Sequence, residues 1–251
     1  MTDNPYESPR TPDEPQVTYQ KREVAWMTES GAILKDILTY AYRGSGKYLL
    51  ITCVVLSVVG DLAGVLPLIG FVVSLMVSGF FCAIYFQLIQ STATGGSEAP
   101  EFPDLSDFLG DIIWPMVQVF VVSLISFGPG IAYALMSHQS GPHPLITLGL
   151  LGLGAIYFPM AVLAVVVLGT LGAASPHIVV PAIFRAGWLY WLGIGLLILL
   201  VAVGSVIGSA FSGSVILSAL VTSIVGAYTA MTNARILGVI YRERQEELGW
   251  L

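Results

Sequence analysis

Three aspartates recur at helical spacing after the second long apolar stretch of the sequence. Asp104, Asp107 and Asp111 lie three and four residues apart, so a helix would place their carboxylates on one face. Such a face could hold a divalent cation, as some lipid-headgroup transferases do. No second acidic cluster or basic substrate clamp accompanies them, so we expect the acids to face water or basic residues such as Arg43 and Arg185.

Arginine is the second residue type with chemical potential here, because its guanidinium group binds phosphate bidentately. Arg235 lies near the end of the last apolar stretch, where it could contact a lipid phosphate or extend to the headgroups. With the three aspartates, Arg43 and Arg185, it forms a predicted cytoplasmic interaction face. Anionic lipid repels an acidic helix, so we expect this face to contact a protein partner or another part of the chain.

No other residue pattern predicts catalysis or metal binding. His138 and His143 fall in one predicted loop and His177 on the opposite side of the membrane, so the three cannot form one metal site. Cys53 and Cys82 lie within separate apolar stretches, where small-residue packing is the simpler interpretation. The sequence shows no catalytic triad, nucleotide-binding loop or metal motif. We therefore predict no catalytic residue, no cofactor and no metal site.

The composition requires a bilayer as the solvent for these elements. The chain is 55% hydrophobic and only 10% charged, and its mean hydropathy is +0.82, which is too apolar for a water-soluble surface. The apolar stretches are too long and continuous for barrel strands, so they are read as helices. The predicted fold class is all-α, a polytopic membrane bundle. Its six spans are residues 48–66, 67–90, 112–136, 145–171, 188–211 and 214–238.

The six predicted spans group into three hairpins, and each hairpin follows an interfacial helix. Ile33, Leu34, Ile37 and Leu38 recur at helical spacing before the first span, and similar segments precede the third and the fifth. The prolines and polar residues of 1–28 cannot form a core, which predicts a disordered cytoplasmic tail. Residues 29–242 then form the transmembrane domain, and 243–251 a cytoplasmic carboxyl-terminal tail.

All ten Lys and Arg residues lie at a terminus or a predicted turn. With six crossings they fall on one side of the bilayer, and the excess of basic residues in cytoplasmic segments makes that side the cytoplasm. Both termini are then cytoplasmic, in the cytoplasmic (inner) membrane of a bacterium. The acidic loop 91–111 contains no Lys or Arg, so only the helix count places it on the same side.

A stripe of small residues gives the clearest packing signal in the sequence. The last span has a small residue at every fourth position: Ser214, Ser218, Thr222, Gly226, Ala230, Ala234 and Gly238. Such a stripe lets another helix backbone approach closely. Packing within one chain is the main interpretation, and a homo-oligomer contact is the alternative.

Several short motifs resemble those of a known group of proteins. They are Asn-Pro-Tyr-Glu-Ser-Pro at 4–9, the loop Gly-Gly-Ser-Glu-Ala-Pro-Glu-Phe-Pro-Asp-Leu-Ser-Asp-Phe-Leu-Gly-Asp at 95–111, Ala-Arg-Ile-Leu-Gly-Val-Ile-Tyr-Arg at 234–242 and Leu-Gly-Trp at 248–250. The chain thereby resembles a family of uncharacterised bacterial membrane proteins with a domain of unknown function. It is distantly similar to Yip-type and glycerophosphodiesterase membrane domains. The resemblance implies six helices in the cytoplasmic membrane and supplies no catalytic residues.

These patterns favour a non-enzymatic membrane protein that organises protein partners or lipid. A subunit of a transporter or channel for a small solute is the first alternative, although the scarcity of charges within the spans weighs against a pump. A membrane-embedded enzyme acting on lipid phosphate is the second alternative. The expected partners are the lipid bilayer and either a second copy or another membrane protein, and no nucleic acid is expected.

Overall fold

A computed structural model describes residues 31–64, 66–96, 100, 107–137, 141, 143–211 and 213–250. All regular structure in these ranges is helical, which confirms the all-α prediction. Residues 31–39 are helical and belong to a separate unit. The second unit contains, in chain order, η1 (Tyr40–Tyr42), α2 (Gly46–Ala63), α3 (Pro67–Ala93), η3 (Leu109–Ile113), α4 (Trp114–Met136), α5 (Pro144–Leu168), η4 (Leu171–Ala174), α6 (Pro176–Ala210) and α7 (Val215–Leu248).

Five helical segments of the described chain are long and apolar enough to cross a membrane. They are α2, α3, the continuous segment of η3 and α4, α5, and α6. Each coincides with one of the first five predicted spans. The predicted sixth span coincides with α7, which is not among the five. Six crossings and their arrangement as three hairpins therefore stay a prediction.

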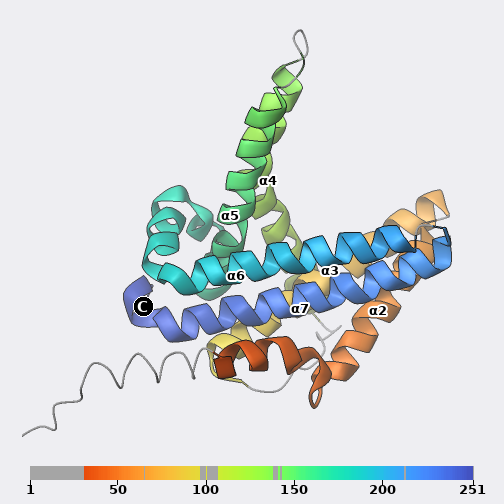
Figure 1. Ribbon diagram of the computed structural model, residues 1–251, viewed down its shortest axis with the longest axis horizontal. Coiled ribbons are helices and arrows are strands. Elements are labelled where there is room, and N and C mark those ends of the chain that lie inside the picture. Colours follow the sequence, from red (N-terminus) through yellow and green to blue (C-terminus); the bar gives the residue numbers. More distant parts are fainter. Residues whose placement is uncertain are drawn as a thin grey trace, which may run out of the picture. The chain divides into compact units, whose positions relative to one another are not determined.

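Helix α7 makes the most extensive contacts of the described helices in the second unit. It lies along α6 and also contacts α3 and α2, while α4 packs mainly against α5 (Figure 1). The Asn233 side-chain amide donates a hydrogen bond of 3.0 Å to the Tyr85 hydroxyl, which joins α7 to α3. The Tyr190 hydroxyl of α6 likewise donates to the Ile156 carbonyl oxygen of α5. These polar contacts fix helix pairs where apolar surface alone gives little selectivity.

A break at Gly187 divides α6 into two helical parts. The backbone there has φ 64° and ψ −148°, a conformation that residues with a Cβ rarely adopt. The preceding part, residues 176–186, corresponds to the predicted interfacial segment before the fifth span. The following part, residues 188–210, corresponds to that span. The predicted boundary and the observed break therefore fall at the same place.

Local signals account for the ends of several helices. Pro144 and Pro176 occupy the first positions of α5 and α6, where the missing N–H is not needed. Ser214 caps α7, because its hydroxyl accepts a hydrogen bond of 3.5 Å from the Leu217 amide. Gly169 ends α5 in the left-handed conformation, with φ 68°. This last ending places the end of α5 beside a pocket.

Candidate functional site

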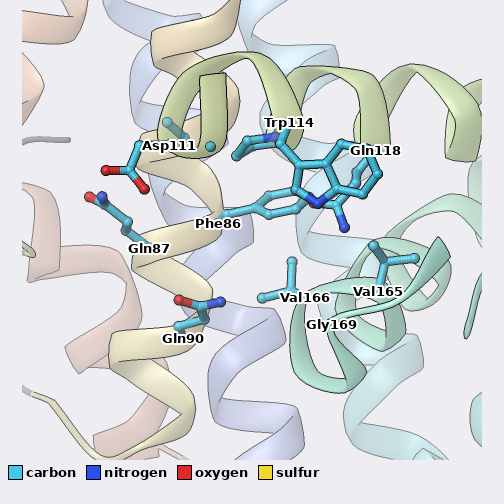
Figure 2. A pocket seen from close by; sticks show the side chains of 12 residues that line it. Phe86, Gln87, Gln90, Asp111, Trp114, Gln118, Val165, Val166 and Gly169 are labelled. Atoms are coloured by element: carbon cyan, nitrogen blue, oxygen red, sulfur yellow. The ribbon is translucent and has the colours of Figure 1, made fainter. Parts of the chain in front are cut away.

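A pocket of about 300 Å³ lies between α3, the η3–α4 segment and the end of α5. Its volume is at the lower end of the range for small-molecule sites. Four of its side chains contain an amide or carboxylate group, and the rest are mainly aromatic or aliphatic (Figure 2). The lining residues are Ala83, Phe86, Gln87, Gln90, Gly110, Asp111, Trp114, Pro115, Gln118, Val165, Val166 and Gly169.

The polar side chains come from two helical segments that face one another. Gln87 and Gln90 lie one turn apart on α3, and Asp111 and Gln118 lie two turns apart on the η3–α4 segment. Both spacings place the side chains on one helix face. Figure 2 shows the Asp111 carboxylate and the Gln87 amide close together on one side of the pocket, with the Trp114 indole on the other. Amides, a carboxylate and a ring thus surround one small volume.

Burial makes two of the three amides, those of Gln118 and Gln87, costly unless something binds them, whereas Gln90 is exposed. Gln118 is only 5% exposed. The Gln87 side-chain oxygen is buried and accepts no hydrogen bond from the described residues. An unsatisfied buried acceptor costs about 1–3 kcal/mol. Gln87 therefore leaves hydrogen-bonding capacity unused beside the pocket.

The turn that positions Asp111 has an unusual helical geometry. Residues Leu109–Ile113 form a π-helical turn, and such turns occur frequently at functional sites. The Asp107 carboxylate accepts a hydrogen bond of 3.1 Å from the Gly110 amide and so stabilises the start of this turn. Gly79 of α3 allows Ile112 to pack closely, because a Cβ at position 79 would lie 2.7 Å from the Ile112 Cγ2. These contacts hold Asp111 against α3.

The three aspartates of the predicted interaction face differ in their positions. Asp104 lies outside the described residues. Asp107 is exposed and is used by the hydrogen bond to Gly110, whereas Asp111 is half-buried and lines the pocket. Among the described residues no group of three or more His, Cys, Asp or Glu side chains could hold a metal ion.

The three arginines of the predicted interaction face also lie in different environments. Arg43 is exposed. Arg185 is exposed as well, and its guanidinium donates a hydrogen bond of 3.3 Å to the Leu248 carbonyl oxygen near the end of α7. Arg235, in contrast, is only 4% exposed. The single interaction face formed by these arginines and the aspartates stays a prediction.

Arg235 makes contacts inside the protein. Its Nη1 donates hydrogen bonds to the Thr92 hydroxyl, at 3.2 Å, and to the Gly96 carbonyl oxygen, at 2.6 Å. Its guanidinium also lies over the Tyr40 ring, 4.6 Å from the ring centre, within the range of a cation–π contact. Arg235 therefore joins α7 to the end of α3 and to η1. Its guanidinium, which was expected to reach the lipid headgroups, makes these contacts within the protein.

The small-residue stripe of α7 meets two different neighbours. Toward the carboxyl end, Gly238 packs against Thr92 and Ile89 of α3, and Ala234 is fully buried. Toward the amino end, the stripe lines a groove of about 450 Å³ between α6 and α7. The stripe residues of that groove are Ser218, Thr222, Gly226 and Ala230, and Ser214 caps the helix before it. The closest packing of the stripe within the chain is thus in its second half, against α3, while Thr222 of the first half lies near Gly208 of α6.

Sequence reasoning singled out Asp111 but missed the other polar groups of the pocket. Gln87, Gln90 and Gln118 have no charge, and the search for chemistry followed ionisable residues. A polar side chain within a long apolar stretch is itself a signal, because such groups are costly in a membrane and usually face the protein interior. The spacing of Gln87 and Gln90 on one helix face would have strengthened it.

A scan against protein-family models finds no match, and neither the curated proteins nor the solved structures that were searched give one. The resemblance to bacterial membrane proteins with a domain of unknown function therefore stays a prediction, and the pocket is interpreted from its own residues.

Proposed function

We propose that this chain is a multi-pass, non-enzymatic protein of the bacterial cytoplasmic membrane, with both termini in the cytoplasm. We further propose that it organises lipid or a small solute by binding a polar group in the pocket between α3, α4 and α5. The observation that supports this function most directly is the group of four polar side chains in one pocket between highly apolar helices. The placement of the basic residues supports the orientation.

The cost of burial favours a binding role for these side chains. Burying a neutral carboxamide without a hydrogen-bond partner costs on the order of 1–3 kcal/mol of folding free energy in protein mutational data. Burying an unpaired carboxylate costs more. Gln118 is buried, and the buried Gln87 oxygen receives no hydrogen bond from the part of the chain that the structure describes. A polar ligand would supply the missing hydrogen bonds.

The lining favours binding over chemical conversion. Asp111 is the one ionisable side chain among the twelve lining residues. Acid–base catalysis normally uses a positioned acid and a base of matched pKa, and covalent catalysis uses an activated nucleophile. The twelve lining residues include neither an acid with a matched base nor an activated nucleophile. The lining also offers no basic side chain for a phosphate, which weighs against the enzyme acting on lipid phosphate.

Transport of a small solute is the second candidate, and two prolines favour it. Pro129 lies within α4 and Pro159 within α5, the two helices that pack together beside the pocket. A proline inside a membrane helix leaves a backbone carbonyl free and permits bending. A pocket between bending helices would suit alternating exposure of a bound solute.

A ligand screen on the full-length protein tests the proposed function. Purified protein in detergent is heated with a panel of polar lipids and small solutes, and ligand binding is read from the rise in Tm. A ligand at 100 times its Kd stabilises the folded state by about 2.7 kcal/mol. We expect at least one stabilising ligand, and we expect Gln118→Met to weaken its effect. The matched control is Gln245→Met in α7, outside the pocket.

Two outcomes would decide the matter. If no panel member stabilises the protein, or if Gln118→Met and Gln245→Met respond like the wild type, the binding function is wrong. If the stabilising ligand also crosses the membrane of proteoliposomes in a protein-dependent manner, transport replaces non-transporting binding as the function.

A further inference from the structure

We infer that the ligand of this pocket presents a positively charged ammonium group, which binds between the Asp111 carboxylate and the Trp114 ring. This inference rests on the proposed function and names the chemical class of its ligand. The source could be a lipid headgroup or a free amine, since both offer the same group.

Charge is the first argument. None of the twelve lining residues is Lys, Arg or His, and Asp111 is the one acid. An anion such as phosphate would meet a like charge and no cationic partner. A cation would meet an opposite charge in a partly enclosed site, where Coulomb attraction is less screened than in open water.

The rings around that carboxylate also favour a cation. Trp114 lies one turn after Asp111 on the same segment, so both side chains face the pocket (Figure 2). Phe86 adds a second ring from α3. Aromatic ring faces attract ammonium groups, and tryptophan does so most strongly. A carboxylate with nearby rings is therefore a composition typical of ammonium recognition.

Hydrogen bonding is the third argument. The ammonium nitrogen of a protonated amine has N–H donors and no acceptor. The pocket supplies acceptor oxygens from Asp111, Gln87 and Gln90, and the buried Gln87 oxygen receives no hydrogen bond from the described residues. A protonated amine would satisfy both the charge of Asp111 and the unused acceptor of Gln87.

The volume limits the size of the bound group. A pocket of about 300 Å³ holds a small amine or a lipid headgroup, while the rest of a lipid must stay outside. The outer surfaces of the surrounding helices are apolar, with Phe120 and Leu124 of α4 exposed at 62% and 51%. Lipid chains could therefore lie against α4 while the headgroup occupies the pocket.

The test measures binding of ethanolamine, choline and, as a neutral probe, glycerol to the full-length protein in detergent. Affinity is followed by the rise in Tm at constant ionic strength. We expect ethanolamine to bind through its charge, its N–H donors and the rings. Choline, which has no N–H, should bind through its charge and the rings alone, and glycerol should not bind. Asp111→Asn should weaken ammonium binding about tenfold or more, because one partner of a close charge pair is lost. The control Asp61→Asn, at the end of α2 and outside the pocket, should leave it unchanged.

A second variant keeps the inference testable if Asp111→Asn does not fold. Trp114→Leu retains the carboxylate and should reduce choline affinity several-fold, since the ring contact is lost. For the source, native mass spectrometry compares retention of phosphatidylethanolamine with that of phosphatidylglycerol. Preferential retention of the ethanolamine lipid supports a headgroup, and binding of free amines without lipid preference supports a soluble amine.

Two results would overturn the inference and separate it from the proposed function. If glycerol or another neutral ligand binds and the ammonium probes do not, the ligand class is wrong while pocket binding stands. If ammonium binding is equal in the wild type and in both pocket variants, the Asp111–Trp114 site is wrong. Failure of every panel member to bind would remove the proposed function as well.

Discussion

Two glycines of the α7 stripe allow a direct test of which part of the stripe packs within the chain. A Cβ added at Gly238 would lie 2.4 Å from the Thr92 Cβ, 2.6 Å from the Thr92 Cγ2 and 2.9 Å from the Ile89 carbonyl oxygen. A Cβ added at Gly226, in the same helix, would meet nothing within 4 Å. We therefore expect Gly238→Ala and Gly226→Ala to have opposite effects on stability.

The expected magnitude follows from these distances. Carbon atoms in contact normally lie about 3.5–4.0 Å apart, so Gly238→Ala requires α7 and α3 to separate by roughly 1 Å. Overpacking of this kind costs about 1–3 kcal/mol, and the gain in helix propensity from glycine to alanine returns about 0.5–1 kcal/mol. The net loss for Gly238→Ala is then about 0–2.5 kcal/mol. Gly226→Ala should stabilise the protein by up to about 1 kcal/mol, because only the propensity gain applies.

The measurement is reversible unfolding of the full-length protein in mixed micelles with increasing sodium dodecyl sulfate. The free energies of unfolding of the wild type and the two variants are compared at one protein concentration. Equal effects of the two substitutions, or a more stable Gly238→Ala, would refute the close contact between α7 and α3. Repeating the titration at a tenfold higher concentration separates packing within one chain from association of copies, since only association depends on concentration.

Two further predictions concern a side-chain contact and a strained turn. In a double-mutant cycle, Tyr85→Phe and Asn233→Leu should show a coupling free energy of about 0.6 kcal/mol, the average for hydrogen bonds between membrane helices. A coupling near zero in the same unfolding assay would contradict the 3.0 Å hydrogen bond between the two side chains. Gly187→Ala should lower the free energy of unfolding by about 1–3 kcal/mol, because alanine is strained at φ 64°, ψ −148°. Gly195→Ala in the same helix, where a Cβ meets nothing within 4 Å, is its control, and equal effects of both would argue against the break.

The sequence predicted the positions of the helices well, because long apolar stretches leave few alternatives in a bilayer. All six predicted spans coincide with a long helix of the described chain. Because the helices are so apolar, their packing against one another could not be predicted. Apart from a few polar side chains such as Gln87 and Gln90, helices such as α3 and α5 are apolar around their circumference, so no strong amphipathic pattern shows which face meets a neighbour. Only particular residues, such as Gly238 against Thr92, settle that question.

The candidate site was predictable only in part. Asp111 stood out by its charge and spacing, but Gln87 and Gln90, which line the same pocket, belong to a different helix. Their position around one pocket depends on how α3 packs against the η3–α4 segment, which includes Ile112 against Gly79. Arg235 was expected to reach the lipid headgroups because the residues near it in the sequence offer no acceptor for its guanidinium. The hydrogen bond to Thr92, which lies far away in the chain, could not be read from the sequence.

The contacts of Arg235 bear on the order in which the protein is assembled during synthesis. An arginine within an isolated helix costs about 2.5–3.5 kcal/mol at the centre of a membrane. Tyr40, Thr92 and Gly96, which receive its guanidinium group, all precede α7 in the chain and so leave the ribosome first. The segments that receive the arginine are thus made before α7. The predicted crossing of α7 would then use a protein surface as well as lipid, and we expect it to depend on the earlier helices.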